Sequence, residues 1–250
     1  MLNLDQFLNY KMPNKSLNLT GRNKRGWQDR FWPVKLAQTL EEEKLLATYI
    51  LPGMGADSSM YGEASRKLEG VKYINWPSYN NEHSISEVAK WIIQEVKIQA
   101  QDTIGGSSLG GIIAAEISKH VIVNKLILIG STLTPDNINP LLKKLSALSV
   151  ITPVNFIQAF AGKANSIHEN KLLKMFSHSE PLFIKSMCTA VFEWDGNKKP
   201  NCAVSHVHGE KDNVILPPSN GAEIIKGGGH LIALTHETSV VEFIRRSLTP

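Results

Sequence analysis

The sequence TIGGSSLGGIIAAEISKH, residues 103–120, decides the fold of this chain. Its first five residues predict a buried strand, and apolar residues recur at helical spacing over 109–120. A strand that turns sharply into a helix through GxSxG, here residues 106–110, is typical of a turn that exposes its central serine. The flanking glycines leave room for a strained backbone. The pattern therefore makes Ser108, not Ser107, a candidate nucleophile.

A glycine-rich turn between a strand and a helix can also bind phosphate. That interpretation needs GxGxxG and an acidic residue at the end of the next strand. Residues 105–111, GGSSLGG, do not have this spacing. The nucleophile interpretation is therefore favoured.

Apolar runs and helical repeats alternate outward from this turn. They predict strands over residues 47–51, 71–76, 103–107, 125–129, 203–207 and 222–225, and helices over 85–96, 109–120 and 239–248. Ser84 and Glu87 are typical of a capping box at the start of a helix. The alternation predicts an α/β fold with a mostly parallel sheet and helices on both faces.

Residues 133–200, between the fourth and fifth predicted strands, have a mostly helical pattern. The amphipathic segments in this region cover residues 141–148, 154–160, 171–176 and 182–194. Ordinary core helices are one interpretation. Because the region interrupts the succession of strands, we expect instead a helical cap insertion of about residues 133–200 over the edge of the sheet.

The composition is that of an ordinary globular domain, with 42% hydrophobic and 20% charged residues. The net charge of +4 is uneven, because residues 1–40 carry seven Lys or Arg and two Asp, and the rest has a balance of −1. We expect residues 1–46 to be a basic extension, solvated or disordered, and residues 47–250 to form the domain. A basic tail can bind nucleic acid or anionic lipid. The body has no basic stripe interleaved with aromatic residues, so we expect no nucleic-acid partner.

Cys188 and Cys202 are too few for a disulfide framework, and neither lies in a zinc-ligand pattern. We therefore expect free thiols, no metal and no cofactor. The N-terminal residues lack the features of a signal peptide, and no run of 18 apolar residues predicts a membrane span. These features favour a cytoplasmic protein. The oligomeric state stays open.

A serine nucleophile needs a base to take its proton and an acid to orient the base. The fifth predicted strand leads into HGEKD, residues 208–212, and the sixth leads into GGGH, residues 227–230. Asp212 is the predicted acid and His230 the predicted base. Asp136, after the fourth strand, is the alternative acid.

Other residues near these turns have predicted supporting roles. We expect His208 to brace the loop of Asp212 through hydrogen bonds, and His206 either to do the same or to pack. The developing oxyanion needs two backbone N–H donors. Leu109, directly after the serine, is one candidate donor, and Met54 in LPGMG, residues 51–55, is the other.

The motifs LPGMG, GGSSLGG, HGEKD and GGGH occur in an order that resembles the α/β-hydrolase superfamily over about residues 47–250. The resemblance is to short, esterase-like members with a helical cap. It departs from many members at Ser107, where they have His, and at the Pro-Gly that stands for His-Gly in the oxyanion motif. It implies a catalytic triad and an oxyanion hole made by Ser108, Asp212, His230, Met54 and Leu109.

By this resemblance we expect a serine hydrolase that cleaves a small-molecule carboxylic ester or thioester through an acyl-enzyme. A cap rich in Leu, Ile, Phe and Met suggests a partly apolar acyl group. An acyltransferase, or a C–C hydrolase or lyase, could use the same triad, since the fold does not fix the reaction. A non-catalytic binding protein on the same scaffold is a third alternative, disfavoured because all three triad residues are present.

Overall fold

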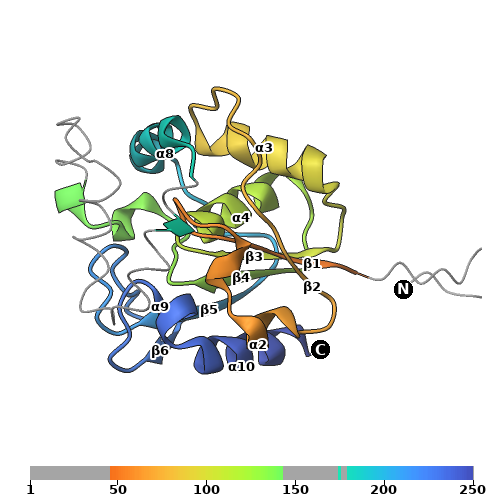
Figure 1. Ribbon diagram of the computed structural model, residues 1–250, viewed down its shortest axis with the longest axis vertical. Coiled ribbons are helices and arrows are strands. Elements are labelled where there is room, and N and C mark those ends of the chain that lie inside the picture. The colour runs from red at the N-terminus through yellow and green to blue at the C-terminus, as the bar shows by residue number, and fades with distance from the viewer. Residues whose placement is uncertain (1–45, 143–173, 176–178, 250) are drawn as a thin grey trace, which may run out of the picture. The chain divides into compact units, whose positions relative to one another are not determined.

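The computed structural model describes residues 46–142, 174–175 and 179–249 (Figure 1). The predicted N-terminal extension, apart from its last residue, lies outside these ranges. Half of the predicted cap does too, including the segment at 154–160. The domain boundaries and the cap as a whole therefore stay predictions.

Six strands form one sheet in the order β2-β1-β3-β4-β5-β6, and each neighbouring pair is parallel. Their bounds are β1 Thr48–Leu51, β2 Val71–Tyr73, β3 Thr103–Ser107, β4 Lys125–Ile129, β5 Ala203–Gly209 and β6 Glu223–Ile225. Every residue of β1 and β3 is buried, as expected for a parallel sheet that is covered on both faces. The predicted α/β architecture is confirmed.

Helices cover both faces of the sheet (Figure 1). On one side lie α3 (Ile85–Val96), α4 (Leu109–His120) and α8 (Pro181–Glu193), and on the other lie α2 (Glu63–Arg66), α9 (Ile232–Thr235) and α10 (Glu237–Leu248). Two short 3₁₀ helices, η2 (Ser58–Met60) and η3 (Pro135–Asn137), follow β1 and β4. Each layer of helices has its own cluster of buried apolar side chains against the sheet.

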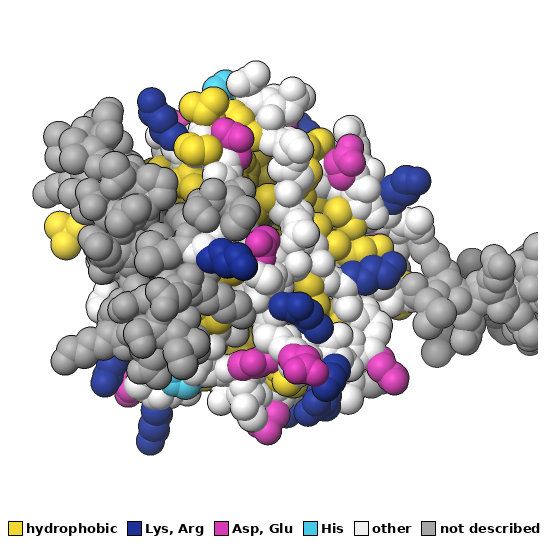
Figure 2. Space-filling view, viewed as in Figure 1, with side chains coloured by type: hydrophobic (Ala, Val, Ile, Leu, Met, Phe, Trp, Pro, Cys, Tyr) yellow, Lys and Arg dark blue, Asp and Glu magenta, His cyan; other side chains and the backbone are white. Residues whose placement is uncertain are grey.

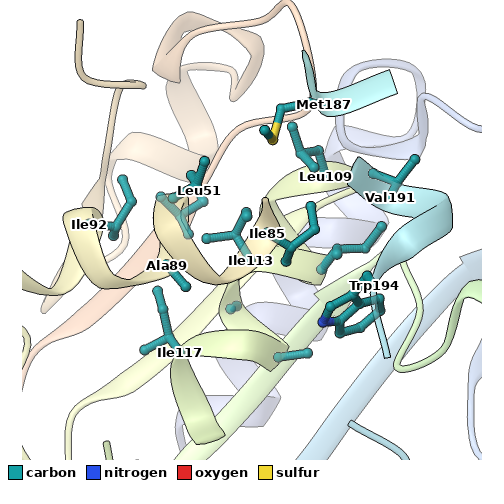
Figure 3. Packing of buried hydrophobic residues seen from close by; sticks show 14 of the residues in the cluster. Leu51, Ile85, Ala89, Ile92, Leu109, Ile113, Ile117, Met187, Val191 and Trp194 are labelled. Carbon is teal, nitrogen blue, oxygen red and sulfur yellow. The ribbon is translucent and has the colours of Figure 1, made fainter. Parts of the chain in front are cut away.

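The larger cluster joins the sheet to the layer of α3, α4 and α8. Figure 3 shows Leu51 of β1, Ile85 of α3, Ile113 of α4 and Met187 of α8 packed together, all at most 2% exposed. Burying a side chain of this size contributes about 1.5–3 kcal/mol. Helix α8, which lies within the predicted cap, is therefore anchored on the body of the domain.

The start of α3 matches the predicted capping box. The Glu87 backbone N–H donates to the Ser84 hydroxyl at 3.2 Å, and the Ser84 N–H donates to the Glu87 carboxylate at 3.1 Å. Both bonds satisfy N–H groups that have no partner within the helix.

The second strand is shorter than predicted. The sequence pattern extends to residue 76, but β2 ends at Tyr73, which pairs with Ile50 of β1. Because β2 is an edge strand, only β1 can hold it in the sheet. Trp76 therefore lies in the loop after β2.

The face shown in Figure 2 carries both signs of charge. Basic and acidic side chains are interspersed over the region where Figure 1 places α2 and α10. One ion pair joins Glu63 of α2 to Lys67 directly after it at 2.8 Å, and another joins Arg246 of α10 to Glu223 of β6 at 2.7 Å. Among the described helices, none is long and apolar enough to cross a membrane.

Candidate functional site

The turn between β3 and α4 has the strained backbone that its sequence predicts. Ser108 lies there with φ 52° and ψ −119°, a conformation that is uncommon for a residue with a side chain. Gly110 allows the close approach behind it, since a Cβ at that position would lie 2.4 Å from the Pro52 carbonyl oxygen. The Ser131 hydroxyl donates to the Ser108 carbonyl at 2.7 Å and holds the turn.

Three side chains from distant parts of the chain meet at this turn. His230 Nδ1 lies 2.9 Å from Asp212 Oδ2, and His230 Nε2 lies 2.8 Å from Ser108 Oγ. An ionised carboxylate only accepts hydrogen bonds, so Nδ1 carries the proton. Nε2 is then free to accept the proton of the serine hydroxyl. The structure thus brings the predicted nucleophile, base and acid together.

Asp212 follows β5 and is only 2% exposed. Burial alone raises the pKa of its carboxyl, but the adjacent His230 and hydrogen bonds from His208, His230 and Val214 outweigh burial and bring the pKa well below its usual range. Asp212 Oδ1 accepts from the N–H groups of Val214 and Ile215, at 2.9 and 3.1 Å. The acid is therefore charged and fixed in position.

His208 braces this acid, as predicted. Its Nε2 lies 3.1 Å from Asp212 Oδ2 and 2.8 Å from the Ile215 carbonyl oxygen, and the side chain is fully buried. Its Nδ1 lies 3.1 Å from His206 Nε2. Burial and the neighbouring His208 lower the pKa of His206 to about 4, so His206 is neutral at neutral pH. A continuous polar chain thus runs from His206 to Ser108.

The alternative acid lies elsewhere. Asp136 is exposed in η3 and pairs with Lys198 at 3.0 Å. The Thr134 hydroxyl and Lys198 lower the pKa of this carboxyl. Neither partner belongs to the site. Glu210, in the same turn as Asp212, accepts from the Gly227 N–H at 2.8 Å.

The two predicted oxyanion donors flank the serine. Leu109 is the first residue of α4, so its N–H has no partner within the helix. Met54 lies in the loop after β1, directly after Gly53. Gly53 lies close to the serine, since a Cβ built on Gly53 would be 3.7 Å from Ser108 Cβ. Over the described part of the chain, neither N–H donates to a protein acceptor.

An apolar pocket opens beside Ser108. Side chains of α4, α8 and the loops after β4 and β5 form its walls, and none of the described lining residues is charged. Burial raises the pKa of the Cys188 thiol to about 11, so this thiol stays protonated at neutral pH. The lining residues are Met54, Ser108, Leu109, Ile112, Ile138, Leu142, Cys188, Val191, Phe192, Val214 and Ile215.

Sequence reasoning missed Trp76, which it assigned to a strand. The indole Nε1–H donates to the Gly53 carbonyl oxygen at 2.9 Å, directly before the predicted donor Met54. A tryptophan followed by proline gives no local signal for such a contact. Within the described ranges, no group of three or more His, Cys, Asp and Glu is arranged to hold a metal ion. The expectation of no metal and no cofactor remains a prediction.

Solved structures of esterases and a thioesterase share the fold of this chain. No family model and no curated protein matches the sequence. A lipase-esterase related protein from Clostridium acetobutylicum aligns with TM-score 0.65 and 14% identity, over 81% of this chain and 94% of that one. An esterase from Thermogutta terrifontis aligns with TM-score 0.62 and 15% identity, over 81% and 89%. A thioesterase of the prodiginine biosynthetic pathway in Streptomyces coelicolor aligns with TM-score 0.57 and 14% identity, over 82% and 86%.

Proposed function

Because the chain has the α/β-hydrolase fold, with structural neighbours that include esterases and a thioesterase, we propose that it is a serine hydrolase of carboxylic esters or thioesters. The observation that carries the proposal is the unbroken hydrogen-bonded chain from Asp212 through His230 to Ser108. It ends on a serine whose backbone is held in a strained turn beside an apolar pocket. These features together supply what acyl transfer to a serine needs.

The reaction proceeds in two halves. His230 Nε2 takes the proton of Ser108 Oγ while the oxygen attacks the acyl carbonyl carbon. The N–H groups of Met54 and Leu109 stabilise the negative oxygen of the tetrahedral intermediate. His230 then gives its proton to the departing alcohol or thiol. In the second half, His230 takes a proton from a water molecule, which attacks the acyl-enzyme. His230 then returns the proton to Ser108 Oγ as the carboxylic acid is released. Asp212 stays ionised throughout.

The pocket favours an uncharged, apolar acyl chain. A charged acyl group would lose its hydration there without gaining an ionic partner among the described lining residues. Each buried methylene contributes about 0.8 kcal/mol. We therefore assign the pocket to the acyl part of the substrate.

Labelling by a fluorophosphonate probe tests the proposed nucleophile. We expect the folded protein to form one covalent adduct, and peptide mapping by mass spectrometry to locate it on Ser108. The probe requires a serine activated by a base. Heat-denatured protein is the control and is expected to stay unlabelled. Folded protein that does not react, or that carries the adduct on Ser107, contradicts the proposal.

Narrowing the pocket is expected to shorten the preferred acyl chain. Cys188 is a partly exposed residue of α8 in the pocket wall, and Cys188→Phe fills the space beside it. We expect kcat/KM for p-nitrophenyl octanoate to fall by about 10-fold or more relative to the acetate, since two or three methylenes lose their burial. Cys202→Phe, outside the pocket, is the matched control and leaves the ratio unchanged. An unchanged octanoate-to-acetate ratio in Cys188→Phe contradicts the assignment.

A further inference from the structure

The loop after β1 carries the proposed oxyanion donor Met54, and two groups hold the carbonyl just before it. The Gly53 carbonyl oxygen accepts from the Ala56 N–H at 3.2 Å, which closes a turn with Gly55 at φ 70°. It also accepts from the indole Nε1–H of Trp76 at 2.9 Å. The second bond crosses from one loop to another, because Trp76 follows β2.

The planar peptide bond links the orientation of the Gly53 carbonyl to that of the Met54 N–H. The Gly53 carbonyl and the Met54 N–H belong to one planar trans peptide unit, in which C=O and N–H point in opposite directions. A bond that fixes the carbonyl therefore fixes the N–H. Gly53 lies close to the nucleophile: a Cβ built at this position would be 3.7 Å from Ser108 Cβ. The orientation of this peptide unit therefore affects where the Met54 N–H lies relative to the reacting atoms.

Trp76 is itself held in place. Its ring packs on Phe183 of α8 with centroids 5.3 Å apart, and it is partly buried against the larger hydrophobic cluster. The ring packing limits rotation of the indole and so keeps Nε1–H directed at Gly53. Phe183, on which the indole ring packs, belongs to α8 within the predicted cap.

We propose that Trp76 is a positioning residue for the oxyanion hole, acting through the Gly53 carbonyl to aim the Met54 N–H at the tetrahedral intermediate. The proposal rests on the proposed serine hydrolase function. Trp76 does not touch the substrate in this role. Its contribution appears in the transition state, where the negative oxygen forms, and not in binding of the neutral ester.

The test compares two identical substitutions at different indoles. Trp76→Phe keeps a ring for Phe183 but removes the N–H. Trp194→Phe is the matched control, since it removes a buried indole bond of 2.8 Å to Glu116 Oε2 at the other end of α8. The measurements are kcat and KM for p-nitrophenyl butyrate, and the inhibition constant of a trifluoromethyl ketone. Endpoint fluorophosphonate labelling counts the competent sites, so kcat is expressed per folded site.

For Trp76→Phe we expect kcat to fall about 10- to 100-fold, somewhat less than the loss of a whole oxyanion donor. KM stays within about threefold of wild type, and the affinity for the ketone falls in parallel with kcat. Trp194→Phe keeps wild-type kcat per site. Two results overturn the positioning role while leaving the hydrolase intact: unchanged kcat in Trp76→Phe, or an equal loss in both variants. Folded wild type that neither turns over the ester nor reacts with the probe overturns the proposed function, and this inference with it.

Discussion

Replacement of Ser108 by alanine is expected to lower kcat/KM for a p-nitrophenyl ester by roughly 10⁵- to 10⁶-fold, the loss seen when a triad nucleophile is removed. The alanine lacks the oxygen that lies 2.8 Å from His230 Nε2, so no acyl-enzyme can form. It keeps a Cβ at φ 52°, and therefore the backbone strain of the turn is unchanged. We expect the melting temperature to stay near that of wild type.

Ser107→Ala is the matched control, because it removes the hydroxyl of the adjacent serine. Ser107 is the last residue of β3 and is 2% exposed, and no hydrogen bond of its side chain occurs within the described structure. We expect activity close to wild type. Equal residual activity in both variants, or full activity in Ser108→Ala, contradicts the assignment of the nucleophile.

The part of the fold that depends on local pattern could be predicted. The bounds of β3, β4, α3 and α4 match the sequence prediction, and the Ser84 capping box is present. Each of these elements is fixed by its own apolar spacing and by the residues at its ends. The end of β2 could not be predicted in this way, because it depends on how much of β1 is available for pairing at the sheet edge.

The site could be predicted only in part, because some of its contacts depend on the order of the strands and not on local pattern. Motif order placed Ser108 and His230, but the choice between Asp212 and Asp136 depended on which strand end lies beside the histidine. That neighbourhood is a property of the strand order, in which β5 lies between β4 and β6. The contact of Trp76 with Gly53 spans 23 residues and depends on how the loops after β1 and β2 fold together. No pattern within either loop encodes it.

Asp212→Asn is expected to lower kcat about 10⁴-fold, as for the equivalent change in a serine protease triad. The Val214 and Ile215 N–H groups face Oδ1 and can only donate. The amide oxygen of asparagine therefore occupies their side, and its NH₂ group turns toward His230. His230 must then present an unprotonated Nδ1 and carry its proton on Nε2, facing Ser108. In that tautomer it cannot accept the serine proton.

The same substitution changes how stability depends on pH. The pKa of Asp212 is lowered in the folded protein, so its charge stabilises the fold above the unfolded value of about 3.9. That contribution is lost as the pH falls through the lowered native pKa. The difference in unfolding free energy between wild type and Asp212→Asn is therefore expected to be largest near neutral pH and to shrink below about pH 4. Urea unfolding at several pH values measures it.

Asp136→Asn is the matched control for both effects. Asp136 is the other acid that the sequence allowed, and its side chain is 69% exposed and paired with Lys198. Among the residues that the structure describes, Asp136 has no hydrogen bond or ion pair with His230, so we expect near wild-type kcat. Its exposed ion pair with Lys198 contributes little to stability, because solvent screens the two charges. An equally large loss of activity in Asp136→Asn and in Asp212→Asn contradicts this prediction. The contact with His230 would then not identify the catalytic acid, and Asp212 could not be assigned to the triad.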